Sequence, residues 1–143
     1  MSTEDSAGDI VIFELNKNKL ALELSDVDKI IEVDKIFLMP GAAKASDKIR
    51  GVISNKGEAV VIVNLATIFN PEAVNVSPEK IIILKERVKG VTKVLGLSIG
   101  EAVISFFWKN EITGGHNGTA QDASFKMLNW KSLYDRTVQA LAS

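Results

Sequence analysis

Short apolar runs separated by polar turns recur along the chain, a pattern typical of β-strands. In the segment "IRGVISNKGEAVVIVNL", residues 49–65, two apolar runs flank the polar turn "NKGE". Asn and Gly tolerate positive φ, so this turn suits a tight connection between antiparallel strands. The second run is apolar throughout residues 59–63, which predicts a strand buried on both faces.

Other apolar or alternating runs predict further strands. They cover residues 10–15, 20–24, 36–39, 81–84, 95–99 and 125–128. In residues 20–24 leucines alternate with Ala21 and Glu23, which indicates a strand with one buried face. The segment "KERVKG", residues 85–90, is predicted to turn the chain, and "TGGHNGTAQDAS", residues 113–124, to form a mobile glycine-rich loop.

Two segments have helical spacing instead. Val27, Ile30 and Ile31 share one face of a short predicted helix, which Ser25 is placed to cap. A second helix is predicted at the end of the chain, after the N-cap candidate Asn129. Its apolar stripe consists of Trp130, Leu133, Tyr134, Val138 and Leu141. We expect this helix to pack back on the strands, and a homodimer contact is the alternative.

The two halves of the chain echo each other, since "LALELSDV" at residues 20–27 aligns its apolar positions with "LGLSIGEA" at 95–102. Such an echo fits a chain built from two similar β units. About nine short strands, few helices and no regular alternation of strand and helix predict an all-β barrel architecture.

Composition narrows the class of protein. The chain has 143 residues, 46% of them hydrophobic and 24% charged, which is typical of a globular domain. A net charge of −1 gives no general attraction to nucleic acid or anionic lipid, and the absence of cysteine excludes disulfides and thiolate sites. Residues 1–9 are acidic and polar, unlike a secretion signal, and read as a disordered tail. No apolar run is long enough to insert in a membrane, so we expect a cytoplasmic protein.

The sequence contains no recognisable catalytic or metal-binding pattern. The single histidine, His116, lies in the glycine-rich loop with no second histidine or cysteine to share a metal. Carboxylates are densest between Glu23 and Asp34, where spacing places most of them on a solvated face. The few aromatic residues lie inside apolar runs, which argues against a groove that stacks nucleic-acid bases. We therefore predict no metal, no cofactor and no catalysis.

The hairpin at residues 49–65 resembles the signature hairpin of the CheW-like domain, the adaptor of bacterial chemotaxis arrays. That family shows a pattern close to I-K-G-V-x-N-L-R-G-x-x-V-P-V-I-D-L. The matching residues are Ile49, Arg50, Gly51, Val52, Lys56, Gly57, Val60, Ile62 and Leu65. Upstream, "LELSDVDKI" is similar to the family's I-D-I-x-x-V-Q-E-I. Downstream, "LGLSIGEAV" and "FKMLNWKSL" are similar to strands of its second half, so the resemblance extends over residues 10–134.

This resemblance implies an all-β fold of two small five-stranded SH3-like barrels packed around a shared core, with short helices and a C-terminal helix. The tail would precede a single CheW-like domain, residues 10–143. Its first barrel would cover residues 18–75, and its second residues 76–130 together with strand 10–15. CheW-like proteins are non-catalytic adaptors between chemoreceptors and the regulatory domain of the histidine kinase CheA. The receptor's helical-hairpin tip is received in the groove between the barrels.

The resemblance also implies a set of partner-binding residues. They are Val27, Lys29, Ile30, Arg50, Gly51, Lys56 and Gly57. Val27 and Ile30 would form part of the apolar groove wall, and Lys56-Gly57 corresponds to the family's Arg-Gly at the hairpin tip. A turn held by two core strands presents its charge to a partner with little ordering cost.

The polar surface departs from the family pattern more than the core does. Lys56 replaces an arginine, which keeps the charge but loses the planar guanidinium. Lys29 stands where the family has a glutamate, a reversal of charge on the implied receptor face. We interpret this chain as a divergent adaptor with altered partner specificity.

A different class of function remains open as the alternative. A small-ligand-binding or hydrolytic barrel would use the carboxylates near Asp26 and Asp28. It would need a closed pocket around these groups.

Overall fold

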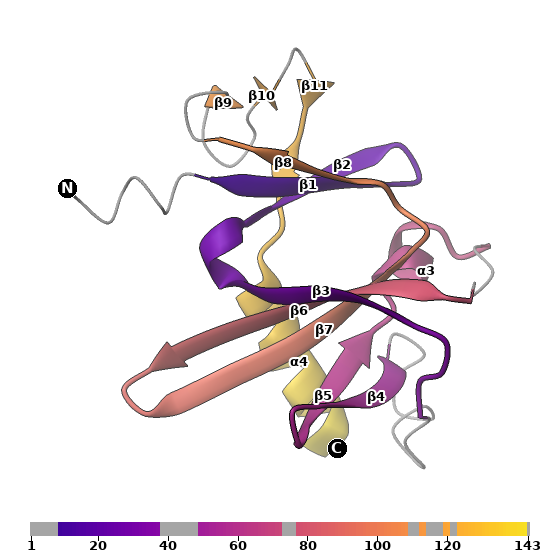
Figure 1. The fold of residues 1–143 in the computed structure, drawn as a ribbon, viewed down its shortest axis with the longest axis vertical. Coiled ribbons are helices and arrows are strands. Elements are labelled where there is room, and N and C mark those ends of the chain that lie inside the picture. Colours follow the sequence, from indigo (N-terminus) through magenta and orange to yellow (C-terminus); the bar gives the residue numbers. More distant parts are fainter. Residues whose placement is uncertain are drawn as a thin grey trace. The chain divides into compact units, whose positions relative to one another are not determined.

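The computed structural model describes residues 9–37, 49–72, 77–108, 112–113, 119–120 and 123–142 (Figure 1). They form a mainly β protein, which confirms the predicted fold class. The chain divides into two compact units, one of residues 1–27 and 102–128 and the other of residues 28–101 and 129–143. Residues 1–8 of the tail predicted at 1–9, the end of the strand predicted at 36–39, and His116 lie outside the described residues. Asp9, the last residue of that tail, is held in the fold, since its carbonyl accepts a hydrogen bond from the N–H of Leu24.

The first unit is built on a four-stranded sheet in the order β12-β2-β1-β8. Its strands are β1 (Ile10–Leu15), β2 (Asn18–Glu23), β8 (Ile104–Phe107) and β12 (Lys126–Met127). One face of this sheet packs Ile10, Ile12, Ala21 and Phe125 into a core. Three short strands, β9 (Ile112–Thr113), β10 (Thr119–Ala120) and β11 (Ala123–Ser124), form a separate small sheet. β10 and β11 lie within the segment 113–124 predicted as a loop, and β9 overlaps its start, so that prediction is wrong in part.

Two predictions around residues 20–31 are wrong. Ala21 is as fully buried as its neighbours Leu20 and Leu22, so side chains on both faces of β2 are buried at these positions. The predicted helix at Val27–Ile31 is a strand, β3 (Val27–Val33), preceded by one 3-10 turn, η1 (Leu24–Asp26). The β-branched residues that gave the helical spacing lose χ1 freedom in a helix and favour a strand. Tertiary pairing with β6 therefore overrides the local spacing.

The second unit is a five-stranded sheet in the order β3-β6-β7-β5-β4. Besides β3 it comprises β4 (Ile49–Asn55), β5 (Glu58–Val63), β6 (Glu79–Val88) and β7 (Val91–Gly100). The β4–β5 hairpin is confirmed, although Ala59 is exposed and burial of β5 begins at Val60. The turn predicted at 85–90 is wrong in its extent, because β6 continues to Val88 and only Lys89-Gly90 turns the chain. Cross-strand pairing with β7 keeps these charged residues extended.

The two edges of the five-stranded sheet are joined at one end by the chain that follows β3. Phe37 forms a bridge with Val52 of β4, through backbone N–O distances of 3.0 and 2.7 Å. Only three residues separate Val33, at the end of β3, from Phe37. An extended chain of that length spans about 14 Å, so β3 and β4, at opposite ends of the strand order, come close together. The sheet therefore curls toward a barrel.

A glycine makes this closure possible. Gly51 has φ +149°, and a Cβ built on it would lie 2.4 Å from the backbone oxygen of Phe37 and 2.6 Å from Cγ2 of Ile36. No side chain fits at that position while Phe37 remains bonded to Val52. The register of β4 also shifts between Ile49 and Gly51, which marks a β-bulge at Arg50.

The helices of the second unit are short. α4 (Trp130–Ala142) is the predicted C-terminal helix, and the backbone N–H of Ser132 donates to Oδ1 of Asn129 at 3.1 Å, which confirms the N-cap. Trp130 is buried and α4 packs against β7, as expected for a helix that folds back on the strands. α3 (Leu65–Phe69), a helix of five residues capped by Asn64, has no counterpart among the predicted elements.

The units do not follow the predicted barrel boundaries at residues 75 and 76. Strand β5, from the predicted first barrel, pairs in parallel with β7 from the second. Strand β3 likewise lies beside β6. The packing of two barrels around a shared core stays a prediction.

Gly51→Ala tests the closure of the sheet. We expect it to lower the free energy of unfolding by about 2–3 kcal/mol, because the methyl group displaces the backbone of Phe37. Gly57→Ala is the matched control, since Gly57 has φ +78° but nothing within 4 Å of its Cβ position. It should lower stability by only about 1 kcal/mol, through backbone strain alone. Equal losses in urea denaturation of the two variants would contradict the close packing at Gly51.

Candidate partner-contact site

Three of the predicted contact residues lie on β3. Val27, Lys29 and Ile30 are all half-buried. Because side chains alternate along a strand, Val27 and Lys29 lie on the face of β3 that also carries Ile31, which packs on the core, and Ile30 lies on the other face. Val27 and Ile30 therefore do not share one face, as they would in the predicted helix. Whether they contact a partner stays a prediction.

The hairpin tip is the most accessible of the predicted contact positions. Lys56 and Gly57 have φ of 53° and 78°, the left-handed pair that a two-residue type I′ turn requires. Both residues are exposed, and Lys56 forms no ion pair within the part of the chain that the structure describes. The flanking pair Asn55 and Glu58 closes the turn onto the β4–β5 ladder. Lys56 is therefore an exposed cation on a well-defined turn.

Arg50 is used inside the fold. Its Nη2 lies 3.0 Å from Oε1 of Glu79, and the two side chains are 20% and 4% exposed. Oε2 of Glu79 accepts a buried hydrogen bond from the hydroxyl of Ser98. The bulge turns Arg50 toward this carboxylate, so that residues of β4, β6 and β7 form one polar cluster. We call Arg50, Glu79 and Ser98 the buried polar cluster.

The buried polar cluster supports the curvature of the sheet. In the strand order β4 and β6 are separated by β7 and β5, a distance of about 14 Å in a flat sheet. An ion pair between their side chains requires the sheet to curl. Nε of Arg50 is buried and has no hydrogen-bond partner in the described structure, so Glu79 is its main electrostatic support.

The remaining predicted position, Gly51, is buried where the backbone of Phe37 passes close to β4. Its closeness to Phe37 explains why the segment needs glycine whether or not a partner binds. The structure brings Arg50 and Gly51 together at the bulge. Lys56 and Gly57 form the turn that follows the opposite end of β4, after Asn55.

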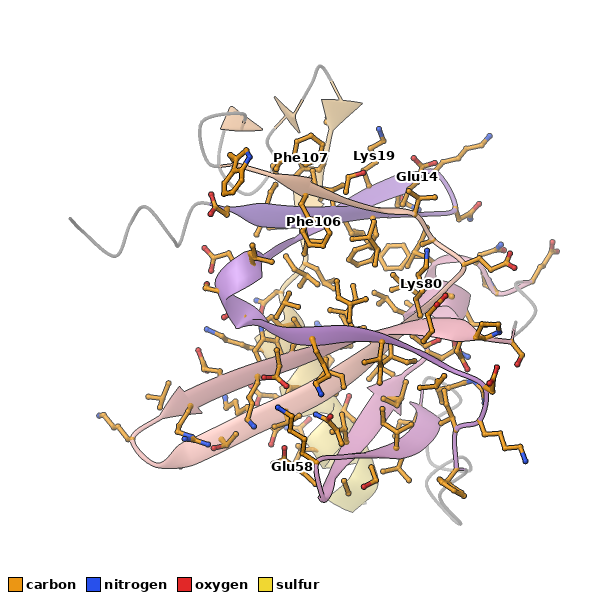
Figure 2. The ribbon with its side chains drawn as sticks, in the orientation of Figure 1. Glu14, Lys19, Glu58, Lys80, Phe106 and Phe107 are labelled. Atoms are coloured by element: carbon orange, nitrogen blue, oxygen red, sulfur yellow. The ribbon has the colours of Figure 1, made fainter. Side chains whose placement is uncertain are left out.

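The carboxylates of the alternative function do not form a site in the described residues. Asp26 lies in the η1 turn and Asp28 is exposed on β3. Among the residues described, no group of three or more His, Cys, Asp or Glu side chains is arranged to hold a metal ion. A hollow of about 190 Å³ on the first unit is lined instead by Ile12, Phe13, Glu14, Lys19, Val103, Ser105 and Phe107. Figure 2 shows Glu14 and Lys19 beside Phe107 in this unit.

Comparison with known proteins identifies the family. A model of the CheW-like domain matches residues 9–105, more than half of the chain. The chain belongs to the CheW-like domain family. The match includes β3, both strands of the β4–β5 hairpin and the whole of the five-stranded sheet. CheW-like domains are scaffolding domains without catalytic activity, so family membership confirms the prediction that this chain is not an enzyme.

The fold agrees with this family. The structure is similar to the crystal structure of the scaffolding protein TtCheW from Thermoanaerobacter tengcongensis, with a TM-score of 0.60. The two sequences are 20% identical, and the similarity covers 83% of this chain and 86% of that chain. A search of curated proteins gave no match. In the described part of this CheW-like chain, no helix is long and apolar enough to cross a membrane.

Sequence reasoning missed Glu79 and Ser98. Both are polar residues next to apolar runs, Glu79 before "IIIL" and Ser98 inside "LGLSIG". Alternation with Leu97 and Ile99 places Ser98 on the outward face of the predicted strand, so the sequence pattern carries no signal of its burial. Its partner Glu79 is 19 residues away, and their contact depends on the register of β6 and β7.

Glu79→Ala tests the buried polar cluster. It should lower the free energy of unfolding by about 3–5 kcal/mol, because Arg50 is left as an uncompensated, largely buried charge. The double variant Arg50→Met with Glu79→Met should recover most of this loss, since the pair is replaced by apolar groups of similar volume. Urea denaturation of the two variants measures the difference. A double variant as unstable as Glu79→Ala would show that the pair itself supplies the stability.

Proposed function

We propose that this CheW-like chain is a cytoplasmic, non-catalytic adaptor that couples chemoreceptors to a CheA-type histidine kinase in chemotaxis. The family match over residues 9–105 carries the proposal. In this role the chain binds the helical-hairpin tip of a receptor and the regulatory domain of the kinase. No observation favours the alternative barrel that uses Asp26 and Asp28.

The exposure and internal contacts of the predicted positions support different roles for them. Lys56 is exposed at a tight turn and has no carboxylate partner among the described residues, which supports a contact role. Arg50 and Gly51 maintain the bulge and its closure. In the proposed adaptor Lys56 tunes partner choice, whereas Arg50 and Gly51 act by holding the hairpin.

The charges at two of the predicted contact positions suit a divergent specificity. Lys29 and Lys56 are both cations, where the family pattern has a glutamate and an arginine. A partner adapted to this chain therefore presents carboxylates to both positions. Matching charges at a rim increase the association rate and exclude partners with the wrong sign.

Lys56→Glu should weaken capture of the kinase regulatory domain or the receptor tip by about tenfold, because it reverses the exposed charge at the contact. Lys17→Glu is the matched control, since Lys17 is also an exposed turn cation with positive φ. Binding to purified receptor and kinase fragments of the source organism measures both variants. If Lys17→Glu also lost binding to these fragments, the effect would be one of general charge and not of a contact at Lys56.

Ile30→Glu tests the apolar part of the proposed contact. We expect loss of receptor capture with an unchanged β-rich circular dichroism spectrum, because a carboxylate would be desolvated at the interface. Val103→Glu adds the same charge at a residue that is 75% exposed in the first unit, and should bind normally. Wild-type affinity for Ile30→Glu would remove β3 from the interface. If wild-type protein captured neither fragment, the adaptor function itself would be refuted.

A further inference from the structure

The outer part of the β6–β7 hairpin, residues 85–94, extends past the pairing of β7 with β5. β5 pairs with β7 only at Ile62 with Gly96 and at Val63 with Leu97. A Cβ placed on Gly90, in the turn, would meet no atom within 4 Å. Figure 1 shows this segment running out as a two-stranded ribbon to its turn. We call residues 85–94 the β6–β7 arm.

Helix α4 braces the arm. Nζ of Lys93 lies 3.7 Å from Oδ1 of Asp135 and 5.7 Å from the centroid of the Tyr134 ring. Glu86, opposite Lys93 in the strand register, pairs with Lys131. An isolated two-stranded ribbon is marginally stable, so these contacts keep the arm ordered. The arm therefore projects from the sheet and is held in place by α4. It has little apolar core near its turn.

The arm carries positive charge on a protein that is slightly negative. Lys85, Arg87, Lys89 and Lys93 oppose the single Glu86, a net charge of 4 − 1 = +3, whereas the whole chain has −1. Lys85 is paired with Glu58 at 3.6 Å, a residue labelled beside the β4–β5 turn in Figure 2, and Lys93 with Asp135. Arg87 and Lys89 have no ion pair within the described ranges. Their charge is available to a partner.

Arg87 is oriented for a carboxylate. Its Nε donates to the hydroxyl of Thr92, directly opposite in the register, at 3.3 Å. This bond leaves the two terminal nitrogens of the guanidinium for a ligand. A guanidinium presents two parallel N–H groups that match the two oxygens of a carboxylate.

Thr92, the partner of Arg87, also lines a hollow of about 240 Å³ with apolar and polar walls. The hollow lies between β5, β7 and α4, and its apolar walls are Ala59, Val61, Val94, Leu95, Tyr134 and Val138. Thr137 and Glu58 complete the lining, and the Glu58 carboxylate is paired with Lys85. Val138 is 46% exposed, so the hollow is open to solvent on the helix side. Sites for drug-sized ligands have about 300–1,000 Å³, so this hollow suits one or two apolar side chains.

We propose that the β6–β7 arm and this hollow bind an extended acidic peptide of a partner protein. An apolar side chain of the peptide fills the hollow, and a carboxylate on the same side, two residues along, pairs with Arg87. Side chains two residues apart in a strand lie about 7 Å from each other, which fits sites joined by a single threonine. The proposal does not depend on the adaptor function, because its contacts involve neither Lys56 nor β3.

The test uses the full-length isotope-labelled protein and a short acetylated peptide in which a leucine and an aspartate lie two residues apart, with threonine at the positions between and around them, so that both side chains point to the same side of the extended peptide. Amide chemical shifts should move at residues 58–61, 87–95 and 134–138. Arg87→Glu should weaken binding about tenfold or more, because it removes a charge-assisted bidentate pair. Val138→Trp, which fills the hollow, should weaken binding similarly. Val138→Asp, a second variant at the same exposed site, should weaken binding as well.

Lys17→Glu is the control, since it reverses an exposed turn cation on the first unit and should leave the affinity unchanged. Shifts spread over lysines of the whole chain would overturn the proposal. So would equal binding of a peptide with serine in place of leucine, tighter binding of a single-stranded oligonucleotide, or dimerisation through this face. Receptor and kinase capture by Arg87→Glu should remain normal, so the outcome is separate from that of the adaptor function.

Discussion

The bonding of Phe37 to Val52 across Gly51 is the constraint on which the five-stranded sheet depends. It joins the chain after β3 to the outer edge of β4, and it requires a residue without a Cβ at Gly51. A free edge strand exposes backbone groups that can pair with other chains, and covering the edge removes that risk. The same closure brings Arg50 within ion-pair distance of Glu79.

The closure also divides the polar residues of the signature hairpin into two groups. At the base, Arg50 is withdrawn from solvent and compensated by Glu79, whose second oxygen is bonded to Ser98. At the tip, Lys56 stands on a left-handed turn with no described carboxylate beside it. Residues close in sequence therefore serve different purposes, one in folding and one in the proposed recognition.

The two hairpins of the second unit present charge in the same physical way. Lys56-Gly57 and Lys89-Gly90 are both two-residue turns with positive φ, and each places a lysine ahead of a glycine. The backbone of such turns matches the right-handed twist of the strands, so each lysine lies on a well-ordered turn. In a scaffolding domain this arrangement lowers the entropic cost of binding, because the contact residues are already ordered.

The sequence alone determined the mainly β class, the β4–β5 hairpin, the C-terminal helix with its Asn129 cap, and the family resemblance. Each rests on local chemistry, such as a left-handed turn or a capping side chain, that acts within a few residues. Only the tertiary structure decided that Val27–Val33 is a strand, that β6 continues through its charged end, and that Arg50 is paired inside the fold. These features depend on partners distant in sequence, because pairing and burial outweigh local spacing and polarity.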